Sequence, residues 1–375
     1  MVSSYKRIFK RILIIGVGGS GCKAVKEVVK IEKIPYLLVD TDAEELNNLE
    51  EDKFLVIGKS ITNGLSAGGD VEIGRQAIEN DAIKIRSIFQ SIDLVIITGG
   101  LGGGTASGSI PVLARLAREA GSQSMVLSSL PFIFEGKQKL LIAEESIKRM
   151  RSHTDAIIKF SNEKLKKKLK NEQAEIGYQV SHKFIKDAIE SIWIICSKPS
   201  ICGLDFSSIH TILRYCDGCC NFASVHCNEK ENRSKLISSE LMNHSLMNKG
   251  LLWKNAPGVI ISIRGNKDLL LKEIEEIMEK IINEISDDAW INYGIQLDEK
   301  IEGINVVALV AETWNESLID SNDNLFDHNK EKYNQGTLNL KEYNKGVFSE
   351  MDPTVYNNED LDIPTFRRKK IKLPK

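Results

Sequence analysis

The stretch TGGLGGGTASG, residues 98–108, contains five glycines among residues 99–104. It follows the apolar run 94–97, which predicts a buried strand, and it precedes residues 110–117, which predict a helix. A loop with few side chains between a strand and a helix can point its N–H groups at an anion, and the helix dipole adds positive potential there. The sequence therefore predicts a phosphate-binding loop, since a merely flexible turn rarely needs so many glycines.

This loop has no lysine in the Gly-Lys-Ser/Thr position, which excludes a P-loop. A second glycine loop, GVGGSG at residues 16–21, lies between a predicted strand and a predicted helix, and Asp40 ends the next strand. Alone, this pattern is typical of a Rossmann dinucleotide-binding enzyme with Asp40 on a ribose hydroxyl. A third loop, GLSAGG at residues 64–69, favours a triphosphate with its metal, because a dinucleotide needs one such loop for its pyrophosphate.

Composition limits the class of protein. The length of 375 residues favours two domains, and the net charge of −2 predicts no nucleic-acid partner. Seven cysteines without a secretory signal indicate reduced thiols, so we expect a cytoplasmic protein. No apolar run approaches the roughly 18 residues of a spanning helix, so no integral membrane segment is expected.

Apolar strands alternate with amphipathic helices in the first half of the chain, which predicts an α/β fold with a mostly parallel sheet covered on both faces. The predicted strands lie at 11–15, 36–39, 94–97 and 124–128, and the predicted helices at 23–29, within 71–88, after 108 and at 139–160. A long helix is expected at 179–196. A second α/β unit follows, with strands at 259–264, 289–296 and 304–312 and a helix at 267–284.

Together these segments resemble the FtsZ family of bacterial cell-division GTPases, within the tubulin superfamily. GGGTASG at 102–108 is similar to that family's loop Gly-Gly-Gly-Thr-Gly-Thr-Gly, and DTDA at 40–43, the stretch 64–75 and PFIFEGK at 131–137 match in the same order. The resemblance implies a tubulin/FtsZ-type Rossmann-like GTPase domain with a central helix and a second, smaller α/β domain. The implied divisions are 1–178 (GTPase domain), 179–202 (central helix and entry to the synergy loop), 203–312 (second domain), 313–358 (disordered linker) and 359–375 (partner-binding peptide and basic end).

The resemblance also implies a GTP site with Mg²⁺. The expected nucleotide-binding residues are Gly18, Gly19, Ser20, Gly21, Ala67, Gly68, Gly69, Gly102, Gly103, Gly104, Thr105, Ala106, Ser107, Gly108, Glu135, Lys139, Tyr178 and Lys183. Glu135 takes the ribose hydroxyls, and Tyr178 stacks on the base. Lys23, His182 and Lys183 stand where the family carries Asn, Asn and Asp. Because lysine only donates, guanine preference is expected to be weaker than phosphate binding.

Members of this family stack head to tail, so the nucleotide of one subunit meets the synergy loop of the next. That loop reads Asn-x-Asp-Phe-Ala-Asp in the family and GLDFSS at residues 203–208 of this chain. Asp205 matches the first acid and is the expected catalytic residue, whereas Ser208 replaces the second acid. The resemblance implies GTP hydrolysis across the interface of a homopolymer. The change at Ser208 leaves open a degenerate paralogue that co-assembles without efficient turnover.

Two further segments carry predictions of their own, a cysteine-rich block and the C-terminal end. The spacing of Cys216, Cys219, Cys220 and His226 is only loosely like a zinc site, so packed thiols are expected and no metal ligands are predicted. EDLDIPTFRRKK at 359–370 resembles the family's tail peptide. The expected partner-binding residues are Leu361, Asp362, Ile363, Pro364 and Phe366, which implies a membrane-tethering partner of the FtsA or ZipA type and a place in the mid-cell division ring.

Overall fold

The computed structural model describes residues 11–30, 34–44, 53–166, 174–197, 200–216, 219–312, 355–356 and 359–360. Met1–Ser317 form one compact unit and Leu318–Lys375 a second, in which β11 (Val355–Tyr356) pairs with β12 (Glu359–Asp360). The predicted linker falls almost wholly outside the described residues, and the tail residues Leu361, Asp362, Ile363, Pro364 and Phe366 lie outside them too. Their assignments therefore stay predictions.

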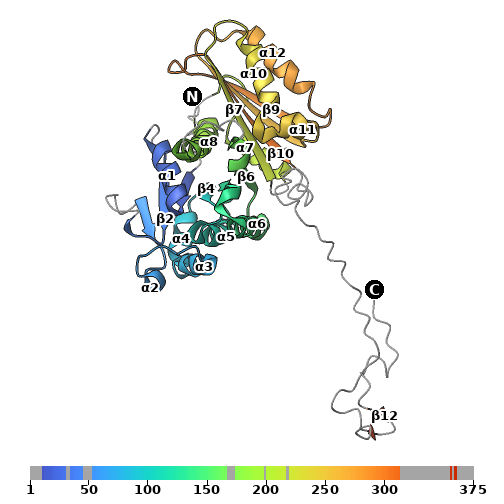
Figure 1. Cartoon of the computed structure of the whole chain (residues 1–375). Coiled ribbons are helices and arrows are strands. Elements are labelled where there is room, and N and C mark those ends of the chain that lie inside the picture. The colour runs from blue at the N-terminus through green and yellow to red at the C-terminus, as the bar shows by residue number, and fades with distance from the viewer. Residues whose placement is uncertain are drawn as a thin grey trace, which may run out of the picture. The chain divides into compact units, whose positions relative to one another are not determined.

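Ten strands in the described part of the first unit form one sheet, in the order β3-β2-β1-β4-β5-β6-β7-β10-β8-β9 (Figure 1). These strands are β1 (Ile12–Val17), β2 (Tyr36–Asp40), β3 (Phe54–Val56), β4 (Leu94–Gly100), β5 (Gln123–Leu130), β6 (Ala156–Ser161), β7 (Cys219–Cys227), β8 (Gly258–Gly265), β9 (Trp290–Leu297) and β10 (Ile304–Glu312). Strands β1 to β6 run parallel, whereas β10 is antiparallel to both β7 and β8. The order 3-2-1-4-5-6 is that of a doubly wound sheet, whose direction of winding switches between β1 and β4.

Helices cover both faces of the β1–β6 part of this sheet. The first core contains side chains from α1 (Gly18–Val29) and α8 (Ala174–Ser197), and it continues to α9 (Phe206–Tyr215), which packs against α8, β8 and β10. The second contains side chains from α3 (Val71–Asn80), α4 (Ala82–Phe89), α5 (Gly104–Glu119) and α6 (Lys137–Arg151). Strand β1 gives Ile12 and Ile14 to the first core and Leu13 and Ile15 to the second, which explains its unbroken apolar sequence.

A third core fills the space around β7, β8 and β10. Its helical side chains come mainly from α10 (Arg233–Met242) and α12 (Leu271–Ile282), together with the fully buried Trp253 of α11 (Leu251–Lys254). The remaining described helices are α2 (Lys59–Thr62), α7 (Asn162–Lys166) and the 3₁₀ turns η3 (Ile133–Glu135) and η4 (Ser245–Gly250). The α/β prediction is confirmed. The predicted divisions at 178/179 and 202/203 fall inside the single unit Met1–Ser317 and stay predictions.

The predicted helix at 139–160 is wrong, because that stretch contains two elements. Helix α6 ends at Arg151, and β6 begins at Ala156 after a turn held by Asp155, whose Oδ2 accepts a 2.7 Å hydrogen bond from Ser124 N. The apolar residues of β6 pair with β5 and are buried in the sheet. Two helices begin earlier than predicted: α1 begins at Gly18 and α5 at Gly104. Several glycines that were assigned to loops therefore belong to first helical turns.

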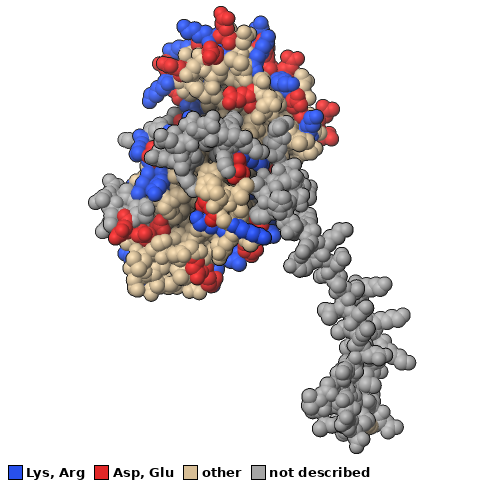
Figure 2. Space-filling model, in the orientation of Figure 1, with Lys and Arg blue, Asp and Glu red and all other residues tan. Residues whose placement is uncertain are grey.

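The surface carries charges of both signs. Figure 2 shows Lys and Arg interspersed with Asp and Glu on the face displayed, which agrees with the net charge of −2. Within the described ranges, no helix has both the length and the apolar character to cross a bilayer.

A half-buried carboxyl in α8 makes stability depend on pH. Burial raises the pKa of Asp187 from 3.8 to about 6, although Lys183 and Lys186 oppose the shift. The folded chain then keeps a proton that the unfolded chain releases, so the free energy of unfolding falls as pH rises between about 4 and 6. The loss is on the order of 2 kcal/mol.

We therefore expect Asp187→Asn to stabilise the protein at pH 7.5 and to change little near pH 3, where the Asp187 carboxyl is mostly protonated in both the folded and the unfolded chain. Urea unfolding at the two pH values measures this, with the acidic sample as the internal control. Equal unfolding midpoints of variant and wild type at pH 7.5 would contradict the prediction.

Candidate polyphosphate site

Two helices begin at the point where the sheet changes its direction of winding. Strand β1 ends at Val17, which lies opposite Gly99 of the parallel neighbour β4. Helix α1 starts at Gly18 and α5 at Gly104, so both N-termini lie at the carboxyl edge of the sheet. Ligands of doubly wound folds bind in the crevice at such an edge.

The N-termini of α1 and α5 lack side-chain caps. Neither Val17 nor Gly103, the two N-cap residues, makes a capping hydrogen bond, and neither helix has an acid in its first turn. By contrast, Asp70 caps α3 and accepts from the N–H groups of Glu72 and Ile73. The first N–H groups of an α-helix have no intrahelical partner and carry positive potential, so α1 and α5 both present donors suited to an anion.

The third glycine loop is linked to α5 through a threonine, Thr41, that was not among the predicted site residues. Thr41 Oγ1 lies 3.0 Å from Thr105 Oγ1 and accepts a 3.1 Å hydrogen bond from Ala67 N. Gly68 and Gly69 follow with φ of +60° and +83°, which favour glycine. The Thr105 hydroxyl, expected to contact nucleotide, is thus engaged with a neighbouring loop.

Several predicted binding glycines pack backbone against backbone. A Cβ on Gly74 of α3 would lie 2.3 Å from Gly104 O, and one on Gly108 would lie 2.3 Å from Val71 O. Similarly, a Cβ on Gly21 would lie 2.4 Å from Thr98 O. Gly21, Gly104 and Gly108 therefore let helices and loops approach closely, whatever they contribute to a ligand.

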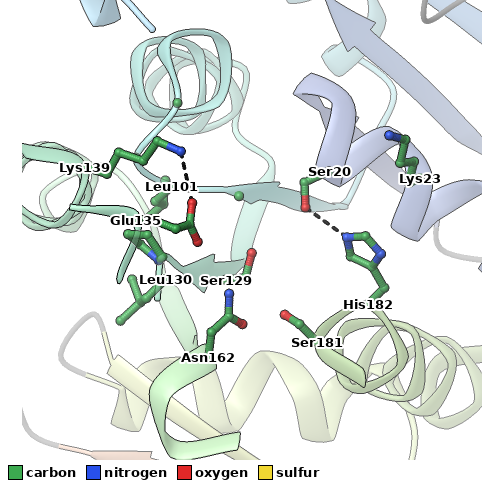
Figure 3. Close-up of a pocket in the computed structure, with 14 residues that line it drawn as sticks. Ser20, Lys23, Leu101, Ser129, Leu130, Glu135, Lys139, Asn162, Ser181 and His182 are labelled. Atoms are coloured by element: carbon green, nitrogen blue, oxygen red, sulfur yellow. Dashed lines mark hydrogen bonds and ion pairs between the residues drawn. The ribbon is translucent and has the colours of Figure 1, made fainter. Parts of the chain in front are cut away.

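A cavity of about 360 Å³ opens beside these helix ends (Figure 3). It is lined by Ser20, Lys23, Gly100, Leu101, Gly102, Gly103, Ser129, Leu130, Pro131, Glu135, Lys139, Asn162, Ser181 and His182. Five of the predicted binding residues thus line it: Ser20, Gly102, Gly103, Glu135 and Lys139. Its size is within the range of small-molecule sites.

Glu135 is held in place on one wall of the cavity. Its Oε1 accepts from Phe132 N at 3.0 Å, and its Oε2 accepts from Lys139 Nζ at 3.0 Å (Figure 3). The carboxylate is mostly buried, with 17% of its side chain exposed. These bonds fix an acceptor at the cavity wall, as the expected contact to ribose hydroxyls requires.

The opposite wall joins α1 to α8. Ser20 Oγ lies 3.1 Å from His182 Nε2 (Figure 3). Burial, and then the neighbouring Lys23 ammonium, lower the pKa of His182, so its ring is neutral at pH 7. Lys183, which was predicted to bind the nucleotide, is exposed and does not line the cavity. The side chain of Tyr178 lies outside the described residues.

Two polar atoms on this side of the cavity lack a partner among the described residues: Asn162 Oδ1 and Ser181 Oγ. Buried polar atoms are normally hydrogen-bonded, so these two are polar groups that a ligand in the cavity could complete, although Trp253 Nε1 and Ser245 Oγ, which do not line the cavity, lack a partner too. Sequence reasoning missed Asn162, Ser181, Ser129 and Thr41. Asn162 directly follows β6, and recognising that strand would have placed it at the same sheet edge as the glycine loops.

Asp205 is exposed and does not line the cavity. It caps α9: Oδ1 accepts from Ser208 N at 3.1 Å and from the Ser207 hydroxyl. Burial disfavours its charge, but these hydrogen bonds outweigh burial and hold the pKa of Asp205 below its ordinary value. Ser208 is only 3% exposed, and its Oγ accepts from Asn292 Nδ2 at 3.0 Å. The Ser208 hydroxyl therefore points into the protein and links α9 to β9.

Asp40 does not support the dinucleotide alternative. Its carboxylate is turned into its own loop, where Oδ1 accepts from Thr41 N at 2.8 Å, and the residue is 4% exposed.

Cys216, Cys219 and Cys220 are buried, and burial raises the pKa of Cys219 to about 12. The described residues contain no group of three or more His, Cys, Asp or Glu arranged to hold a metal ion.

A doubly wound sheet with uncapped helix ends beside a polar cavity is typical of nucleotide-binding proteins. The family model of the Tubulin/FtsZ GTPase domain matches residues 11–170, and that of the FtsZ C-terminal domain matches 222–314. Cell division protein FtsZ of Buchnera aphidicola is 30% identical over 96% of this chain and 97% of its own length. Cell division protein FtsZ 1 of Thermococcus kodakarensis is 30% identical over 81% of each chain.

Solved structures of related proteins share the fold of this chain. An empty FtsZ dimer from M. jannaschii is 28% identical, with a TM-score of 0.74 over 81% of this chain and 88% of that chain. GDP-bound CetZ1 from Haloferax volcanii, 23% identical with a TM-score of 0.67 over 81% of this chain and 95% of that chain, shares the fold. The chain belongs to the FtsZ family, and it is a GTP-binding GTPase of the cell-division cytoskeleton.

The uncapped end of α5 gives a direct test. Gly103 is exposed, has φ −92° and leaves open space where a Cβ would stand, so Gly103→Asp fits without strain. An aspartate there caps the helix and places a negative charge where phosphate is expected. We expect unchanged or higher thermal stability, by up to about 1 kcal/mol, and at least a hundredfold loss of GTP affinity.

Gly103→Asn is the matched control, since it has the same size and capping geometry without charge and should lose much less affinity. Calorimetric titration of both variants measures the difference. GTP binding by Gly103→Asp within threefold of wild type would contradict a phosphate at this helix end.

Proposed function

We propose that the triphosphate of GTP binds between the N-termini of α1 and α5 and the loop that carries Gly68 and Gly69. Three stretches of main chain then surround it: Gly18 to Gly21, Ala67 to Gly69 and Gly102 to Gly108. Ala67 N, Gly102 N and Ser107 N already donate to Thr41 Oγ1, Ser107 Oγ and Gly103 O, so other N–H groups of these stretches would bind the phosphates. The observation that carries this proposal is the pair of uncapped helix ends at one sheet edge, beside a cavity with unpartnered polar atoms. Glu135 accepts from the ribose hydroxyls, and Lys139 adds a cation.

We propose Mg²⁺ as the companion of the bound nucleotide. The protein offers no preformed acidic cluster among its described residues. That fits an ion held mainly by phosphate oxygens and water, as Mg²⁺ commonly is. When bound, it would neutralise charge on the phosphates. The chain's own part is to position the phosphates with backbone amides.

Hydrolysis is proposed to need a second subunit. Asp205 lies outside the cavity, is exposed, and has a lowered pKa that keeps it ionised at neutral pH. Its Oδ1 holds the capping bonds of α9, which fixes the direction of the carboxylate. In a head-to-tail filament this carboxylate would orient water at the γ-phosphate of the neighbouring subunit. The inward Ser208 offers no second acid, so we propose slow turnover.

We further propose that the polymer forms in the cytoplasm at the division site, attached through Leu361, Asp362, Ile363, Pro364 and Phe366 to a membrane-tethering protein of the FtsA or ZipA type. The support is the likeness of this segment to the family's tail peptide and the match to the Buchnera relative over nearly its whole length.

Action across the interface can be tested with two inactive variants. Asp205→Asn keeps the helix cap but loses the charge, so it should bind GTP normally and lose turnover by about 10²–10⁴-fold. Gly103→Asp subunits are expected to bind GTP at least a hundredfold more weakly but carry an intact Asp205. Mixing the two should restore phosphate release at least tenfold above either protein alone, measured above the assembly concentration.

Each variant mixed with itself is the control. A mixture as inactive as its components, although both co-sediment, would place the catalytic carboxylate within the same subunit or elsewhere. Unchanged turnover of Asp205→Asn alone would remove Asp205 from catalysis.

The serine at position 208 is expected to limit the rate. In the capping arrangement, an aspartate at the third helical position of α9 can accept from Asn292 Nδ2 in place of the hydroxyl. Ser208→Asp should therefore fold and raise turnover at least tenfold at unchanged GTP affinity. Ser208→Asn, which has the same shape without charge, should not. Equal phosphate release by both variants would contradict a role for a second acid.

A further inference from the structure

The wall of the cavity between α1 and α8 carries donors and neutral groups. Lys23 offers an ammonium, and Ser20 and His182 form a neutral hydrogen-bonded pair. The acceptors without a partner on this side, Asn162 Oδ1 and Ser181 Oγ, are also uncharged.

Carboxylates are scarce in the cavity. Among the described residues that line it, Glu135 is the one acid, and it lies across the cavity from Ser20 and His182 (Figure 3). No described lining residue of the α1–α8 wall therefore offers a charged acceptor to a base.

From this arrangement we infer that the site recognises 6-oxopurine nucleotides without reading the 2-amino group, so that inosine triphosphate binds nearly as well as GTP. The inference rests on the proposed function and on the expectation that the base lies against the α1–α8 wall, where Lys23 and His182 stand at the base-reading positions. It names a broader substrate class for the same site.

Hydrogen-bond chemistry accounts for each part of this preference. A 6-oxo group accepts from the Lys23 ammonium, whereas the 6-amino group of adenine would meet that ammonium as donor against donor. The Ser20–His182 pair can donate or accept, so it fits either group. The 2-amino group of guanine can meet only neutral oxygens or water. A neutral hydrogen bond contributes about 0.5–1.5 kcal/mol net, which corresponds to roughly a two- to tenfold change in affinity. A charged acceptor would discriminate much more strongly.

Competition binding to the full chain below the assembly concentration tests the inference. The probe is a fluorescent GTP analogue, displaced by GTP, inosine triphosphate or ATP. We expect inosine triphosphate within tenfold of GTP and ATP at least tenfold weaker than inosine triphosphate. If GTP binds but inosine triphosphate binds more than tenfold more weakly, this inference fails and the proposed function stands. If GTP itself does not displace the probe, both fail.

Lys23→Met isolates the 6-oxo contact. It should weaken GTP and inosine triphosphate by the same factor, within twofold, and reduce their advantage over ATP. Lys26→Met is the matched control, since Lys26 lies on the same helix and does not line the cavity, and its affinities should not change. A Lys23→Met effect confined to GTP, or absent, would overturn the inference.

Discussion

A backbone contact between two helices brings the polyphosphate site together. Gly74 of α3 lies against Gly104 at the start of α5, so closely that a single Cβ would stand 2.3 Å from a carbonyl oxygen. Ser109 Oγ adds a 3.1 Å hydrogen bond to Gly74 O across the same crossing. Because α3 carries the loop with Gly68 and Gly69 at its N-terminus, this contact sets that loop beside the start of α5. Any larger residue at the crossing would separate the two.

The expected chemistry of the site depends on main-chain N–H groups that have no side-chain cap at the starts of α1 and α5. Helix α3 is capped by the Asp70 side chain and α9 by the Asp205 side chain. The two helices at the winding switch have no such caps, and their free donors face the same sheet edge. A bound triphosphate would supply the missing acceptors, so nucleotide binding would also stabilise the folded chain.

Much of this was predictable from sequence, and the failures have physical causes. Glycine loops between apolar strands and helices predicted the α/β fold, which is confirmed, and a phosphate-binding edge, which stays a prediction. The sequence could not separate glycines that face a ligand from those, such as Gly21 and Gly108, that allow close packing, because both roles need the absence of a Cβ. Asn162 was missed because the stretch before it reads as one long helix. The inward direction of Ser208 depends on Asn292, which is remote in sequence.

The central claim is that main-chain donors bind the phosphates and supply most of the affinity. Calorimetric titration of the wild-type chain with GTP, GDP, GMP and guanosine tests it directly. The account predicts that affinity falls at each removal of a phosphate, and that guanosine binds at least a thousandfold more weakly than GTP, because charge-assisted hydrogen bonds contribute about 1.5–3 kcal/mol each. Guanosine binding within tenfold of GTP would show that the base carries the affinity and would contradict the account.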